Sequence, residues 1–277
     1  MFAFSHLHRY TTLTAILAAA FAFAEGAHAQ VGLGLTPMRE ELQLAPGAQH
    51  SGVLMVSNDA PGKVRVVAEL LDFYIDAETT PQFLRQAAQE KEYSCRQWLS
   101  INPMEMEMAG KSQATVRYTV RTPADAPARS FHCAMGFTTQ PTAGEARGNS
   151  LRTAVQIVCA LYVAVGQPAA EGSVKDLKLE SIAGTKPQAW RAVVVLANPS
   201  QMHFRPAGDL DVLDAAGKVV ESVKFVPLPV LPKRDQNFIF PLKLAAGPGK
   251  YTLRARVDLG GNEIQEATAL VTAAAKP

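Results

Sequence analysis

The sequence predicts an all-β protein made of two β-sandwich domains in tandem. Short runs rich in β-branched and aromatic residues recur along the chain, roughly 8–15 residues apart, with turn residues between them. Its 18 prolines and 19 glycines are spread throughout, as many turns require. The length of 277 residues suits two domains of roughly 100–150 residues, each large enough for a core of its own.

Residues 1–29 are predicted to form a secretory signal peptide. Arg9 lies in a short polar start, an apolar run follows from Thr14 to Ala24, and Ala27-His28-Ala29 supplies the small-x-small cleavage pattern. The apolar run is too short to remain as a membrane span. We therefore expect a periplasmic or secreted protein that starts at Gln30, with no integral membrane segment after cleavage.

The charge balance argues against some partners. Cleavage removes one Arg and one Glu (Arg9 and Glu25), so the formal net charge of +2 stays with the mature chain. A charge this small favours neither nucleic acid nor an anionic membrane surface as a partner.

The first predicted domain covers residues 30–166 and holds seven strand-like runs, at residues 33–44, 52–57, 63–75, 96–108, 111–121, 130–139 and 152–165. Pro37 within the first run implies an edge strand or a bulge. The polar stretch 76–94 is expected to form a loop with one short helical turn.

Residues 167–174 are small and flexible and form the predicted linker. The second predicted domain, 175–277, again holds seven runs, at residues 175–182, 189–197, 208–213, 219–225, 237–244, 250–258 and 263–271. In both halves a strand ends in Asn before a Pro-containing turn, at Asn58 and Asn198. This strand count and spacing are typical of immunoglobulin-like sandwiches.

The run from Val155 to Val165 has apolar residues on both alternating faces. If it is an edge strand, its free N–H and C=O groups can pair with a strand of another chain, and alternate side chains set the register. If it lies inside a sheet, both faces are covered by this protein's own layers. The sequence leaves both alternatives open.

The three cysteines follow the predicted cleavage point, so one disulfide is expected in an oxidising compartment. Cys133 can pair with Cys159 if residues 130–139 and 152–165 form a hairpin that places Thr139 opposite Thr153. Cys133 can instead pair with Cys95, which ties loop 76–94 to the sheet. We favour Cys95–Cys133, because Cys159 has the pattern of a buried apolar position.

No motif indicates catalysis, a metal or a cofactor. The sequence has no Gly-x-Ser-x-Gly, no His-Glu-x-x-His and no phosphate-binding glycine loop. Met104, Met106 and Met108 alternate with two glutamates, as a half-buried strand requires, so a copper site is not expected. We predict that the protein is not an enzyme.

The ordered elements resemble those of the periplasmic pilus-assembly chaperones, the PapD-like family. The resemblance is carried by Leu35-Thr36-Pro37-Met38-Arg39, Val53–Asn58, Val64–Phe73, Trp98–Pro103 and the strand Val155–Val165 before a hinge. It implies two immunoglobulin-like domains set at an angle, with a cleft that receives a pilin subunit. Family members donate an alternating apolar strand to that subunit and hold its terminal carboxylate on an Arg and a Lys.

The resemblance implies particular binding residues. Arg39 matches the family's cleft Arg, and Val155, Ile157 and Cys159 match the donor alternation. Where the Lys is expected, the sequence reads Leu161 to Val165 with no cation, so the chain resembles a divergent member. The expected partners are a secreted, pilin-like subunit and an outer-membrane usher. The rival interpretation is an extracytoplasmic structural or adhesion module.

Overall fold

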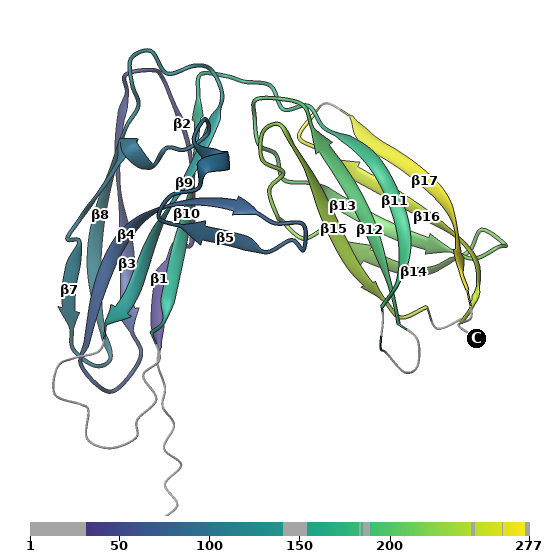
Figure 1. Ribbon diagram of the computed structural model, residues 1–277, viewed down its shortest axis with the longest axis horizontal. Helices are drawn as coiled ribbons and strands as arrows, with labels where there is room; N and C mark the ends of the chain where they lie inside the picture. Colours follow the sequence, from purple (N-terminus) through teal and green to yellow (C-terminus); the bar gives the residue numbers. More distant parts are fainter. Residues whose placement is uncertain are drawn as a thin grey trace, which may run out of the picture.

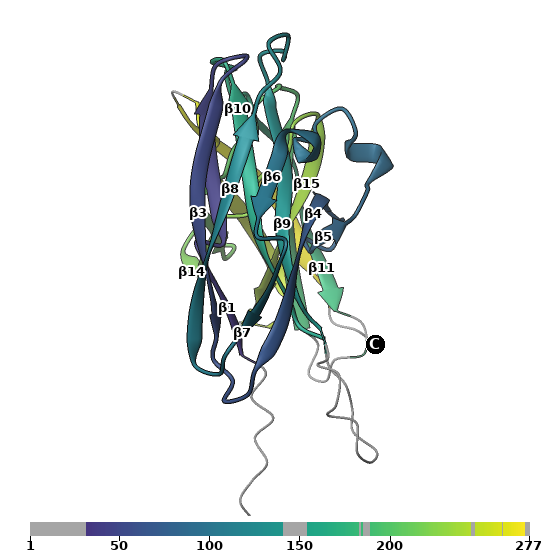
Figure 2. The same cartoon turned by 90° about the vertical axis from the view of Figure 1, so that its left-hand side faces the viewer.

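The computed structural model describes residues 32–140, 154–182, 184, 189–244, 247–261 and 263–274. The predicted signal peptide, 1–29, lies outside the described residues. Figure 1 shows two β-sandwiches side by side, joined at one end by the segment that follows strand β10, and Figure 2 views the first of them from its outer side. The predicted all-β fold with two tandem sandwiches is confirmed.

The first sandwich packs two sheets face to face. One has the strand order β1-β3-β8-β6, and the other has the order β2-β10-β9-β4-β5, with β7 also paired to β4. The bounds of these strands are β1 Leu33–Thr36, β2 Arg39–Leu44, β3 Gln49–Asn58, β4 Val64–Ile75, β5 Pro81–Leu84, β6 Leu99–Asn102, β7 Glu105–Met108, β8 Ser112–Arg121, β9 Ser130–Gln140 and β10 Gln156–Val165.

The second sandwich is built in the same way from a three-stranded and a four-stranded sheet. Their orders are β11-β12-β15 and β14-β13-β16-β17. The bounds are β11 Ser173–Ile182, β12 Ala189–Asn198, β13 Ala207–Leu213, β14 Val219–Lys224, β15 Arg234–Leu242, β16 Gly249–Asp258 and β17 Ile264–Ala273.

Alternation along the strands explains both cores. In β8, Val116, Tyr118 and Val120 are buried, while Thr115, Arg117 and Arg121 are not. Side chains that alternate in this way place one apolar face of each sheet against the other sheet. Each half has its own large buried cluster, so each half has the core that a separate domain needs.

Three predicted elements differ in detail. The run 33–44 divides at Pro37 because β1 pairs antiparallel with β3, whereas β2 crosses to the other sheet and pairs parallel with β10. The run 96–108 divides into β6 and β7. Stretch 76–94 holds the short strand β5 as well as the 3-10 turn η1 (Ala88–Glu90), and η2 (Arg96–Trp98) follows it.

The recurring asparagines have the same role in both halves. The amide of Asn58 donates to the carbonyls of Gly62 and Ala109 at 2.8 and 2.9 Å. The amide of Asn198 donates to the carbonyls of Met202 and Val230, both at 2.9 Å. Each buried side chain thus fixes the turn after its strand by replacing backbone hydrogen bonds.

The two sandwiches contact each other next to the hinge. Backbone N–H of Ser130 donates to the carbonyl of Gln201 at 2.8 Å, and N–H of His203 donates to the Ser130 hydroxyl at 3.0 Å. Farther from the hinge, the buried carboxylate of Glu90 accepts from Arg234 at 2.7 Å and contacts His132 at 3.1 Å. The bonds of Ser130 and the Glu90–Arg234 pair join the two domains directly, and His132 holds the Glu90 carboxylate from within the first domain.

A third contact comes from the hairpin β4–β5, which reaches toward the second sandwich in Figure 1. At its tip the carbonyls of Asp76 and Ala77 accept from the side-chain amides of Gln236 and Asn237, at 3.3 and 3.1 Å. Contacts at the hinge, at Glu90 and at this tip resist rotation of one domain against the other.

Candidate binding edge on strand β10

Strand β10 is enclosed along one half and open along the other. Ala160–Ala164 pairs with β9 on one side and with β2 on the other, and Val165 continues the pairing with β2. Strand β2 begins at Arg39, opposite Ala160, and the Ala160 N–H donates to the Met38 carbonyl at 3.0 Å. Among the described residues, Gln156–Cys159 therefore has a strand neighbour on the β9 side only.

The hydrogen-bond pattern identifies which backbone groups are free. N–H of Thr139 donates to the carbonyl of Val155 at 2.9 Å, so the odd-numbered residues of β10 exchange hydrogen bonds with β9. Even-numbered residues turn their N–H and C=O the other way, as Ala160 does toward β2. The backbone groups of Gln156 and Val158 thus point out of the sheet edge and have no ladder partner in the described part of the chain.

The side chains along β10 face two different surroundings. On the odd face Ile157 is half-buried against the first core, and Cys159, Leu161, Val163 and Val165 are buried within it. On the even face Val158, Ala160 and Tyr162 join a smaller apolar cluster with Leu71, Phe73 and Ala134. That cluster also includes Leu231 of the second domain, so this face of the sheet turns toward the second sandwich.

Both alternatives for the strand at 155–165 therefore hold, each for part of it. The half before Ala160 is a sheet edge, and the half from Ala160 onward is covered on both sides. Val155 and Ile157 lie in the open half and are half-buried. Cys159 is at the limit of the open half. Its side chain is fully buried and its backbone groups face β9, so only Gln156 and Val158 turn backbone groups out of the edge.

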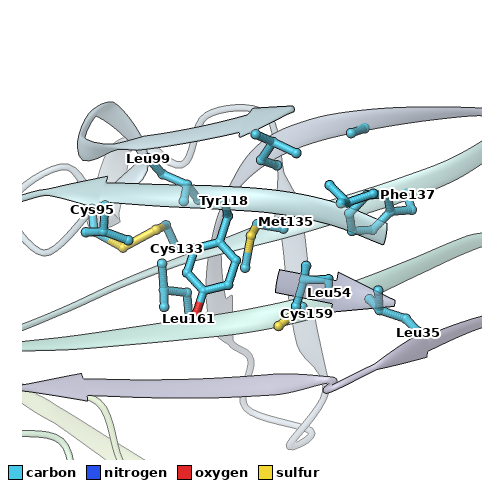
Figure 3. Packing of buried hydrophobic residues seen from close by; sticks show 14 of the residues in the cluster. Leu35, Leu54, Cys95, Leu99, Tyr118, Cys133, Met135, Phe137, Cys159 and Leu161 are labelled. Atoms are coloured by element: carbon cyan, nitrogen blue, oxygen red, sulfur yellow. A yellow bond between two sulfur atoms is a disulfide. The ribbon is translucent and has the colours of Figure 1, made fainter. Parts of the chain in front are cut away.

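The disulfide joins Cys95 to Cys133, with Cα atoms 5.3 Å apart, as the favoured pairing predicts. Figure 3 shows this bond beside Leu99 and Cys159 as a separate thiol near Leu54. The alternative pairing required Cys133 opposite Cys159, but the register places Leu161 opposite Cys133 and Met135 opposite Cys159. Burial, followed by the nearby charge of Glu40, raises the pKa of Cys159 to about 12, so the thiol is inert at neutral pH.

Arg39 lies at the start of β2, beside the end of the open edge, and its side chain is exposed. Its nearest charged partner is Glu41, with Arg39 Nε 3.4 Å from Glu41 Oε1. The same carboxylate accepts a hydrogen bond from Arg205 Nε of the second domain at 2.8 Å. Glu41 thus bridges one arginine from each domain.

Arg39, Glu41 and Arg205, together with Tyr162 and His203, form what we call the hinge cluster. Aromatic packing holds this cluster together. The guanidinium of Arg205 lies 4.7 Å from the centre of the Tyr162 ring, and the His203 ring stacks on Tyr162 at 4.7 Å. Burial lowers the pKa of His203 to about 4, so the ring is neutral at neutral pH. Burial alone would raise the pKa of Glu41, but the hydrogen bond and charge of Arg205, with the charge of Arg39, lower it overall.

Sequence reasoning missed this cluster, although it identified Arg39. Glu41 and Arg205 are 164 residues apart, and neither belongs to a motif. The cluster lies beside an open groove of about 700 Å³ at the hinge, which is lined by Pro168, Met202 and Gly260 among others.

The run of methionines is part of the core only in its second half: Met104 precedes β7 and is 46% exposed, whereas Met106 and Met108 turn inward. Met108 is buried in the first core and Met106 packs against it. The intervening Glu105 and Glu107 form ion pairs with Arg65 and Lys63 on the outer face. No group of three or more His, Cys, Asp or Glu side chains that could hold a metal ion occurs in the described ranges. The same ranges hold no helix with the length and apolarity that a membrane crossing needs.

Comparisons with known proteins give only structural similarities. No family model matches the chain, and no curated protein matches it. The E. coli chaperone DraB is similar at 20% identity and a TM-score of 0.39, over 89% of this chain and 97% of that one.

Two further solved structures are similar to the chain. One is the complex of the Salmonella enterica SafA pilin with the SafB chaperone, at 17% identity and TM-score 0.43, covering 86% and 96% of the two chains. The other is the CsuC–CsuE chaperone–tip adhesion subunit complex of Acinetobacter baumannii, at 8% identity and TM-score 0.44, covering 87% and 98%. At TM-scores below 0.5, these similarities do not by themselves assign a family or a function.

Proposed function

We propose that this chain is an exported, chaperone-like protein that holds a secreted, pilin-type subunit by strand addition and performs no chemistry. The observation that carries the proposal is the open edge of β10 at Gln156–Cys159. A sheet edge with outward N–H and C=O groups is a template for a strand of another chain. The predicted signal peptide supports export to the compartment where such subunits are assembled.

The backbone contribution to this binding is limited. Gln156 and Val158 together offer two donors and two acceptors, hence at most four hydrogen bonds. At about 0.5–1.5 kcal/mol net for each bond, they contribute roughly 2–6 kcal/mol. Micromolar binding needs about 8 kcal/mol, so apolar side chains must supply the rest. Val155 and Ile157 are half-buried apolar side chains on the odd face of the open edge, and we assign this part to them. Val158, on the other face, packs against the smaller apolar cluster.

Arg39 is the proposed anchor for a carboxylate of the subunit. The guanidinium is exposed beside the open edge and forms planar, two-pronged bonds well. Glu41 now contacts both Arg39 and Arg205. A carboxylate from the subunit would compete with Glu41, and Arg205 would supply the second positive charge in place of the absent lysine.

Proline substitution tests the edge residue by residue. Proline removes one N–H and is tolerated in a strand where that N–H points away from the ladder. Val158→Pro and Gln156→Pro each replace an outward N–H by a proline ring, which removes a donor and blocks the approach of the incoming strand. They should therefore abolish capture of the subunit and change the melting temperature by only a few degrees. Ile157→Pro, the matched control, removes a donor to β9 and should unfold the first domain.

Capture would be measured by co-purification from the periplasmic fraction with the mature chain as bait, followed by mass spectrometry. Wild-type chain should retain one β-rich subunit that both edge variants lose. Full capture by folded Val158→Pro and Gln156→Pro variants would refute strand addition at this edge. Absence of any captured subunit with the wild-type chain would favour the structural or adhesion module.

A further inference from the structure

Most sheet edges in this molecule carry a feature that discourages pairing with another chain. Edge strands β1, β5 and β6 have only four residues each, and β5 begins with Pro81. Two of the longer edges carry charges: β2 has Arg39 and two glutamates, and β14 has Glu221 and Lys224. The other two are irregular, because β11 has a register shift near Asp176 and β15 contains Pro241. Such features are the usual protection of exposed edges.

Strand β17 lacks these protections. It forms one edge of the four-stranded sheet of the second domain and runs for ten residues, and β16 is its only ladder partner among the described strands. Glu266 is its only charged residue, and it contains no proline. Its side chains Leu270 and Ile264 are 88% and 72% exposed, the highest values for large hydrophobic residues in the described part of the chain.

The neighbour of β17 in the facing sheet leaves this edge unpaired. Strand β11 runs beside it, and the Gln265 side chain donates to the Gly172 carbonyl at 2.7 Å. The two strands nevertheless belong to different sheets and share no ladder. Leu270 and Ile264 lie on the face of β17 that turns away from the core.

We propose that β17 is a self-association edge, which pairs antiparallel with β17 of a second copy of this chain. The pairing would centre on Ala267, so that Ile264 of each copy lies opposite Leu270 of the other. The two most exposed apolar side chains of each chain would then form two cross-strand pairs. The sheets of two second domains would join into one continuous sheet.

Other registers fit less well. With the centre one residue earlier, Glu266 lies opposite Glu266 of the second copy, and two like charges face each other. With the centre one residue later, Glu266 lies opposite Leu270, and Ile264 lies opposite Thr272. Of these three centres, only the one at Ala267 pairs Ile264 with Leu270 and places Glu266 opposite the neutral Thr268.

The charges on the adjoining strand agree with this register. On β16, Arg256 lies opposite Glu266, and Arg254 lies opposite Thr268. Across the proposed junction each Glu266 would have Arg256 of its own chain on one side. On the other side Thr268 of the second copy would separate it from that copy's Arg254. Each Glu266 thus lies next to an arginine of its own chain and opposite a neutral residue of the second copy. Arg254 and Arg256 also contact Asp211 of their own chain, at 2.8 and 3.4 Å.

This surface is independent of the proposed function. Figure 1 shows β17 in the second sandwich and β10 in the first, so the edge of β10 would remain free in the dimer. Failure of either proposal would leave the other unaffected.

A mixing experiment tests both the pairing and its register. Ile264→Cys and Leu270→Cys would be prepared as separate full-length mature chains. Directly opposite residues in an antiparallel pair are close enough for a disulfide. On oxidation, a mixture of the two variants should form a covalent dimer, whereas either variant alone should form at least about 10-fold less. Equal yields in the mixture and in the single variants would overturn the register.

Sedimentation equilibrium tests the association itself. Leu270→Lys removes an apolar contact twice because of the two-fold symmetry, so the dimer should weaken at least about 100-fold. Val219→Lys on edge strand β14 is the matched control and should leave the dimer unchanged. A wild-type chain that stays monomeric up to about 100 μM overturns the proposal, and so does a dimer that Leu270→Lys does not weaken.

Discussion

Loss of the Cys95–Cys133 bond should destabilise the first domain strongly. The bond closes a loop with a sequence separation of 38 residues. In the chain-entropy account, freeing a loop of that length costs about 4 kcal/mol of unfolding free energy. For a domain of this size, that corresponds to a decrease in melting temperature of roughly 10–20 °C.

Differential scanning calorimetry with and without a reductant measures this effect. Cys159 is a free thiol, so the reductant has one disulfide to act on. The double variant Cys95→Ala/Cys133→Ala is the control, because its melting curve should not respond to reductant. A change of less than about 1 kcal/mol on reduction would refute the entropic reasoning. If reduction lowered the melting temperature of the second domain alone by the same amount, the bond would be stabilising the second domain instead of the first.

Three further predictions concern the hinge, the first core and export. The pKa of His203 is about 4 in the folded chain, below its ordinary value of 6.5, so the unfolded chain binds more protons between these values. Stability should therefore be complete above pH 6.5 and should fall by on the order of 3 kcal/mol as the pH decreases toward 4, where the lowered pKa of Glu41 adds to the loss. His203→Gln should flatten the melting temperature over this range, and an unchanged slope would contradict this assignment. Gly52→Ala places a Cβ 2.4 Å from the buried Tyr118 ring and should cost about 1–3 kcal/mol of unfolding free energy. Adding Tyr118→Leu makes room, so the two changes should be less than additive in denaturant melts, whereas strict additivity would show no clash. N-terminal sequencing of exported chain should begin at Gln30, and recovery of only uncleaved cytoplasmic chain would refute the predicted signal peptide.

Local patterns in the sequence determine most of the strands. Alternation with period two places Val116, Tyr118 and Val120 on one buried face, and this signal is visible without any knowledge of the partner strand. Strand β5 was missed because Pro81–Leu84 is short, begins with proline and lies in a polar stretch. From the sequence, Pro37 indicates only an edge strand or a bulge, because the change of sheet at this residue depends on the strands with which β1 and β2 pair.

The candidate site could be predicted from the sequence only in part, because it too depends on which strands and domains meet. Val155 and Ile157 follow from alternation, but the extent of the open edge depends on the residue at which β2 begins to pair with β10. The contact of Glu41 with Arg205 crosses the domain boundary and leaves no periodic signal. Such long-range contacts are set by packing of the two domains, so a single sequence does not reveal them.

The central claim is that the outward backbone groups of β10 receive a strand from another chain. Residue-resolved amide hydrogen exchange, measured on the free chain and on its complex with the captured subunit, tests it most directly. In the free chain, the amides of Gln156 and Val158 should exchange quickly, while those of Ile157 and Cys159 are protected by β9. In the complex all four should be protected. Gln156 and Val158 amides that are already protected in the free chain, or that stay unprotected in the complex, would contradict the account.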